Sequence, residues 1–129
     1  YYNITSIVKT MDILTTVYLL NSVLLIVHEI DSAYQEEWKL FQIPGGISVF
    51  LLLHIPLVGL MMYGLLEVSV GSSLGTILSL IVSGGGLFAF AIHTYFISKG
   101  NTKFTSQTSR ILLYAILVTS ATQFILTVL

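Results

Sequence analysis

Cysteine is absent from this 129-residue chain, and charged residues make up only 9% of it. The first absence excludes disulfides, thiolate-bound metals, iron–sulfur clusters and covalently attached c-type haem. The second excludes an ordinary water-facing surface, because soluble domains carry about 25% charged residues. Since 55% of the residues are hydrophobic and the net charge is −1, the composition predicts a bilayer-embedded protein and gives no indication of nucleic-acid binding.

Several catalytic motifs are also absent. The segment "HEIDS" at 28–32 does not complete an H-E-x-x-H zinc motif, because Ser32 stands where the second histidine is required. No Walker-type loop or pair of closely spaced histidines occurs. The run "GGG" at 84–86 lies inside an apolar segment, where a role in helix packing is expected rather than phosphate binding. The histidines and the acidic stretch after residue 27 remain as the residues that could form a catalytic or binding site.

Four apolar segments dominate the chain, and a membrane-spanning helix needs roughly 20 such residues. The breaks between them, "PGG", "SVGSS" and "SKGNTKFTSQTSR", are rich in helix-stopping and polar residues. We therefore predict an all-α polytopic membrane protein, with one domain over residues 1–129 and four transmembrane helices in a bundle. The predicted spans are 13–30, 47–66, 74–97 and 111–129.

The segment 32–42 is predicted to be a short interfacial helix after the first span. Tyr34, Trp38 and Phe41 alternate there with polar residues at helical spacing, and such aromatic rings favour the depth of the lipid headgroups. This arrangement indicates an anchor in contact with membrane lipids.

Lysine and arginine are unevenly distributed between the loops. Lys39 lies in the first loop, and Lys99, Lys103 and Arg110 lie in or next to the third, whereas the second loop has none. Because such residues accumulate on the cytoplasmic side, we expect both termini to lie outside the cell membrane.

Each of the first three spans contains one histidine, His28, His54 or His93, and the chain has no others. At about 1.5 Å of rise per residue, all three lie within a layer on the order of 12 Å deep in the cytoplasmic leaflet. A charged group in hydrocarbon costs about 2.5 kcal/mol or more and usually faces a partner inside the bundle. His54 has no polar neighbour on its own helical face, so its partner must come from another helix or a ligand.

The leading interpretation is a transition-metal site, with zinc or iron as the ion, because imidazoles and a carboxylate with open positions suit both metals. The candidate ligands are His28, His54 and His93, with Asp31 or Glu29 as the fourth. Whichever of Asp31 and Glu29 does not bind the metal, or Glu36, would serve as a base or orient a ligand, and a lipid-like substrate could enter from the leaflet.

Other interpretations remain open. His54 and His93 could hold a haem or another pigment in an electron-transfer subunit, with Gly86 allowing a flat ligand or a second helix to approach closely. The histidines could also simply specify packing, in a homo-oligomer or an accessory subunit of a larger membrane complex. In the last span, Thr119 and Gln123 are expected to form hydrogen bonds across helices.

The segments "HEIDSAYQEEWKLF" and "PGGISVFLLLHIPL", followed by His93 before a basic loop, resemble a family of small prokaryotic four-helix membrane proteins of unknown function. This resemblance implies the fold and a prokaryotic inner membrane, and it draws attention to His28, Glu29 and Asp31 together with the two later histidines. The chain is also loosely similar to membrane families named for an H-x-x-E-E motif, which are suspected of metal binding, although Asp31 replaces the first glutamate of that motif.

Overall fold

Helices make up most of residues 12–129, the part of the chain that the computed structural model describes. Four of them are long and apolar enough to cross a membrane, by length and composition. This confirms the predicted all-α bundle of four transmembrane helices. In chain order the helices are α1 (Ile13–Tyr34), α2 (Glu37–Leu40), α3 (Gly46–Ser69), α4 (Ser73–Ser98) and α5 (Gln107–Val128).

Short polar side chains cap three of the four long helices at their first turns. The Asp12 carboxylate accepts a hydrogen bond of 2.7 Å from the backbone N–H of Thr15. The hydroxyls of Ser72 and Ser106 cap α4 and α5 in the same way. Such contacts satisfy backbone donors that have no partner within the helix. Each of these three helices therefore begins directly after its capping residue.

The bundle is apolar outside, and its interior combines apolar and polar side chains. Large apolar side chains on its lateral surface are widely exposed, with Ile13 at 68% and Phe88 at 64%. Several polar side chains, among them Asn21, Ser79 and Gln123, are fully buried. An apolar lateral surface of this extent would aggregate in water, whereas lipid solvates it. The distribution supports a multi-pass membrane protein.

A polar network joins α1, α4 and α5 in the interior. The Asn21 side-chain amide donates a hydrogen bond of 2.7 Å to Gln123 Oε1, and Gln123 Nε2 donates one of 3.0 Å to the carbonyl oxygen of Ser79. The Thr119 hydroxyl donates one of 2.9 Å to Asn21 Oδ1. The cross-helix bonds predicted for Thr119 and Gln123 are confirmed, and they fix the three helices side by side.

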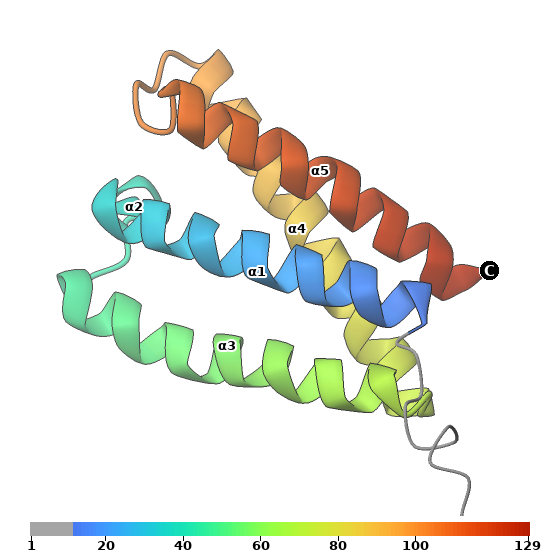
Figure 1. Ribbon diagram of the computed structural model, residues 1–129. Helices are drawn as coiled ribbons and strands as arrows, with labels where there is room; N and C mark the ends of the chain where they lie inside the picture. The colour runs from blue at the N-terminus through green and yellow to red at the C-terminus, as the bar shows by residue number, and fades with distance from the viewer. Residues whose placement is uncertain (1–11) are drawn as a thin grey trace, which may run out of the picture.

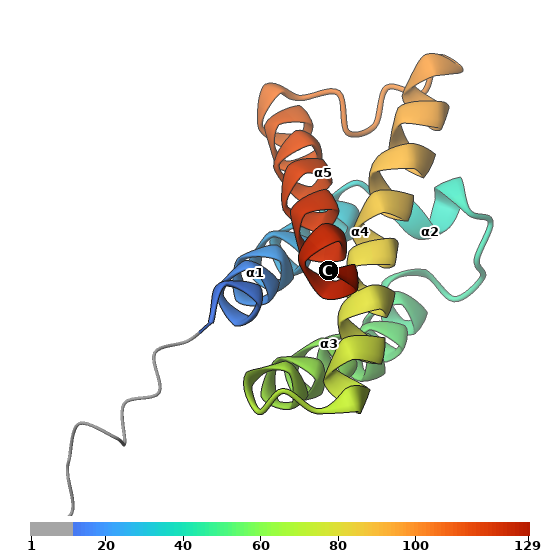
Figure 2. The ribbon, with the colours of Figure 1, turned by 90° about the vertical axis from the view of Figure 1, so that its right-hand side faces the viewer.

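The helices α3 and α4 are close at their connecting turn and separate toward their other ends (Figures 1 and 2). At the turn, a Cβ atom added to Gly75 would lie 2.6 Å from the backbone of Glu67. One turn deeper, Gly64 makes room for the Tyr18 ring of α1, whose hydroxyl donates a hydrogen bond of 3.0 Å to the carbonyl oxygen of Met61. Figure 2 shows α4 leaving this turn and ending far from the start of α3, where a loop joins it to α5.

The interfacial helix expected over 32–42 is shorter in the structure. The helix α1 continues to Tyr34, and only the single turn α2 follows. Between them Glu36 adopts a left-handed conformation with φ of 55°, which interrupts the helix and changes the direction of the chain. This bend directs the chain back toward the bundle and sets the position of Glu37.

Candidate metal centre

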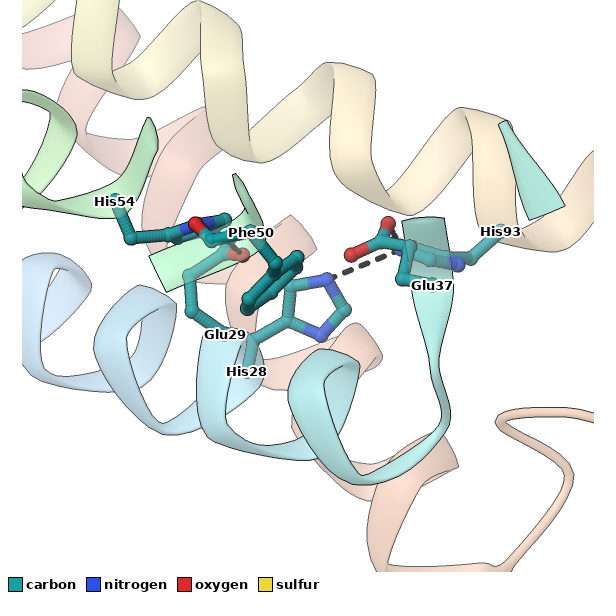
Figure 3. A network of polar contacts seen from close by, with 6 residues as sticks. All are labelled: His28, Glu29, Glu37, Phe50, His54 and His93. Carbon is teal, nitrogen blue, oxygen red and sulfur yellow. Dashed lines mark hydrogen bonds and ion pairs between the residues drawn. The ribbon is translucent and has the colours of Figure 1, made fainter. Parts of the chain in front are cut away.

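Two histidines from different spans meet in the interior. His28 on α1 and His93 on α4 are 2% and 1% exposed, and their Nε2 atoms lie 3.1 Å apart. Glu37 of α2 completes the group, with Oε1 lying 3.1 Å from His93 Nε2. Figure 3 shows these three side chains pointing toward one another. In residues 12–129, this is the group of histidine and acidic side chains whose ligand atoms all lie within 4.8 Å of one another.

These distances suit a shared metal ion. Ligand atoms bound to one tetrahedral zinc ion at about 2.0–2.1 Å are separated by about 3.3 Å, close to the two values of 3.1 Å. Without a cation, two Nε2 atoms can face each other only if one of them carries a proton. Both Nδ1 atoms are buried, and neither has a hydrogen-bond partner within the described part of the chain. The donor atoms therefore converge at the Nε2 side of each ring.

Glu37 reaches the histidines because of the left-handed residue that precedes it. Burial alone would raise the pKa of its carboxyl group, but the contact with His93 and the nearby imidazoles outweigh burial, and the pKa lies below its ordinary value. The carboxylate form is the one that binds a metal ion. A left-handed glutamate costs about 1–3 kcal/mol of local strain, and such strain is often found at functional sites.

The loop 99–106 covers the polar end of the group. Phe104 is 2% exposed, and its ring centroid lies 4.1 Å from that of His93 and 5.7 Å from that of His28. The neighbouring Lys103 ammonium donates a hydrogen bond to the carbonyl oxygen of Gln35 at the end of α1. This loop separates the two imidazoles from the nearer aqueous phase.

His54 forms a separate pair with Glu29. Its Nε2 lies 2.7 Å from Glu29 Oε2, and its Nδ1 lies 2.6 Å from the carbonyl oxygen of Phe50, against whose ring it stacks at 3.9 Å (Figure 3). A carbonyl oxygen can only accept, so Nδ1 carries a proton. The contact at Nε2 then requires one more proton, held either by the imidazolium or by the Glu29 carboxyl group. The predicted partner from another helix is confirmed, and the pair holds a proton between the two side chains.

A cavity of about 350 Å³ connects the two polar groups. It lies between α3 and α4 where these helices separate, with α1 behind it and the segment around Trp38 at one end. Both imidazoles of the buried group, Glu37, Glu29 and His54 contribute to its lining, and the rest of the lining is overwhelmingly apolar. The volume lies within the range of small-molecule sites.

The structure separates the residues singled out from the sequence into four places. His28 and His93 lie together, whereas His54 and Glu29 form their own pair nearby. Asp31 Oδ1 accepts a hydrogen bond of 3.3 Å from Gln35 on the same helix.

Glu36 is not brought to this group. It lies at the surface beside Lys39, and the hydrogen bond and charge of that lysine lower the pKa of its carboxyl group. The carboxylate beside the two histidines is that of Glu37 instead, a residue that was not among the candidates from the sequence.

The comparisons with known proteins give one match. Searches of curated proteins and of solved structures find nothing similar to this chain. A scan against protein families matches residues 14–129 to a family of unknown function (DUF6713). Since the match covers all four long helices, the chain belongs to this family.

Proposed function

We propose that this membrane protein holds a transition-metal ion, zinc or iron, between His28, His93 and Glu37. The observation that carries the proposal is the convergence of the three donor atoms, with two separations of 3.1 Å in a buried group. Two imidazoles and one carboxylate form a common donor set for catalytic zinc and for non-haem iron. Compared with the ligands expected from the sequence, this set omits His54, Glu29 and Asp31 and includes Glu37.

Three protein ligands would leave open coordination positions on the ion, next to the apolar cavity. A metal ion held this way supplies Lewis-acid chemistry to a molecule bound beside it. The polypeptide contributes orientation and exclusion of water, since Phe104 and the apolar walls enclose the imidazoles. The paired Glu29 and His54 contribute a proton at the other side of the same cavity.

The proposal includes the expected orientation in the cell membrane. Lys39, Lys99 and Arg110 are exposed at the end of the bundle that holds the metal group, and such residues favour the cytoplasmic side. The metal would thus lie in the cytoplasmic half, with lipids around the bundle and both termini outside.

Metal content tests the proposal. Protein purified in detergent without a histidine tag is expected to carry about one zinc or iron ion per chain by element-resolved mass spectrometry, and His93→Ala is expected to lose it. His54→Ala is the matched control and keeps the ion, because both nitrogens of His54 are already bonded elsewhere. Protein that binds neither metal after loading with each, or equal loss in both variants, would overturn the proposal.

A haem held by His54 and His93 is the second candidate from the sequence. Two observations count against it: both nitrogens of His54 are engaged, and Gly86 packs against Ser120 of α5 rather than facing an open space. An absorbance spectrum of the same preparation separates the two candidates, because a haem protein shows a Soret band and a zinc protein does not.

A further inference from the structure

The cavity between α3 and α4 is placed to receive a molecule from the bilayer. Leu53 and Leu57 of α3 and Ile81 and Phe88 of α4 line it and are also widely exposed on the lateral surface. Because these side chains both line the cavity and are exposed on the lateral surface, they mark a passage between the two helices. At the opposite side His28 and His93 are covered by the loop 99–106, so the lipid side is the route that the structure leaves to the polar groups.

The charges in the cavity restrict what its polar end can bind. Glu29 and Glu37 line it, whereas no lysine or arginine of residues 12–129 does. A phosphate or carboxylate head beside Glu29 would meet an acidic side chain whose partner, His54, already has both ring nitrogens bonded, at a depth where such repulsion is weakly screened. An uncharged head is therefore favoured over that of a phospholipid or a fatty acid.

The pair of Glu29 and His54 favours a hydroxyl group in particular. A carboxylate offers about four acceptor positions, and the contact with His54 at 2.7 Å uses only one of its two oxygen atoms. A hydroxyl group can donate to the carboxylate and still accept a bond itself. Beyond this pair the walls are apolar, which suits a hydrocarbon chain.

We propose that the cavity binds a long-chain alcohol, an aliphatic or isoprenoid chain with an uncharged hydroxyl head, which enters laterally between α3 and α4 and places its hydroxyl beside Glu29 and His54. This site is separate from the metal group, because neither residue belongs to the three that share the ion. Binding of the alcohol does not require the metal.

Two neighbouring glycines provide a matched pair of variants. A Cβ atom added to Gly85 or to Gly84 would meet nothing within 4 Å, so both positions accept a larger side chain. Only Gly85 lines the cavity. Leucine at position 85 therefore fills the space that the chain would occupy, whereas leucine at position 84 projects from the exposed surface of α4.

The only tryptophan of the chain, Trp38, lines the cavity and reports on occupancy. In lipid nanodiscs, a brominated long-chain alcohol is expected to quench Trp38 fluorescence saturably at low mole fraction, beyond the quenching by brominated phospholipid at equal bromine content. The excess quenching is expected to disappear in Gly85→Leu and persist in Gly84→Leu. The variant Glu29→Gln is expected to weaken binding about 10-fold, the typical effect of losing a hydrogen bond to a charged group.

Non-saturable quenching equal to that of the phospholipid would overturn the proposal, as would saturable quenching that survives in Gly85→Leu. Equal binding of a brominated fatty acid would overturn the choice of an alcohol. Circular dichroism confirms that each variant is folded, and its metal content is measured in parallel. Loss of quenching with metal retained contradicts this proposal alone, and absence of metal with quenching retained contradicts only the metal centre.

Discussion

The variant Glu37→Gln is expected to bind Zn²⁺ or Fe²⁺ more than about 100-fold less tightly than the natural chain. Replacing a residue that merely orients a metal ligand already costs about 10–100-fold, and Glu37 is proposed to be a ligand itself, with Oε1 3.1 Å from His93 Nε2. Glutamine keeps the size of the side chain but removes the negative charge that compensates the ion. Competition with a fluorescent chelator in detergent measures the change.

The adjacent Glu36 is the control for this variant. Its carboxylate lies outside the group and pairs with Lys39, so Glu36→Gln is expected to leave the metal affinity unchanged within about twofold, the level expected for a weak exposed ion pair. Equal affinities in the two variants, or a loss confined to Glu36→Gln, would contradict the assignment of Glu37.

The variant Gly75→Ala is expected to destabilise the bundle by about 2 kcal/mol or more. The added Cβ atom would lie 2.6 Å from the carbonyl of Glu67 and 2.7 Å from the backbone nitrogen of Val68, and backbone atoms cannot rotate away as a side chain can. Overpacking of this kind typically costs 1–3 kcal/mol. Because α3 and α4 meet at this turn, the change also alters the angle at which they separate around the cavity.

Thermal unfolding in detergent, followed by circular dichroism, measures the effect. The variant Gly84→Ala provides the matched control, since its Cβ atom would meet nothing within 4 Å and alanine is the better helix former. A Gly75→Ala protein with the melting temperature of Gly84→Ala would show that α3 and α4 do not pack as described.

The spans could be predicted from the sequence because their cause is local. Runs of about 20 apolar residues have few alternatives to a membrane helix, and Ser72 and Ser106 mark the starts of α4 and α5. The cross-helix bonds of Thr119 and Gln123 were also predictable, since polar groups inside a membrane bundle find partners on neighbouring helices.

The group of His28, His93 and Glu37 was predicted only in part, because its geometry depends on features that are not local. His28 and His93 share a depth, which helical rise reveals, but depth does not show which sides of two helices meet. His54 shares that depth and yet faces Glu29. To predict the direction of the His54 side chain, one would need to know how α3 is rotated about its own axis, and that rotation is set by packing at Gly64 and Tyr18.

Glu37 was missed for a different reason. It lies in a polar segment between two spans, where an exposed glutamate is the ordinary expectation. Its inward position results from the left-handed conformation of Glu36, a conformation that glutamate rarely adopts and that no neighbouring glycine or asparagine signals. The nearest signal in the sequence is a pair of acidic residues directly before Trp38, close to the depth of His28 and His93.

X-ray absorption spectroscopy at the edge of the bound metal tests the proposed coordination by these three side chains. We expect about two imidazole nitrogens and at least one carboxylate oxygen at about 2.0–2.1 Å from the ion, with the same spectrum in His54→Ala and one imidazole fewer in His93→Ala. A spectrum without imidazole scattering, or one in which His54→Ala rather than His93→Ala loses an imidazole, would contradict a metal centre formed by His28, His93 and Glu37.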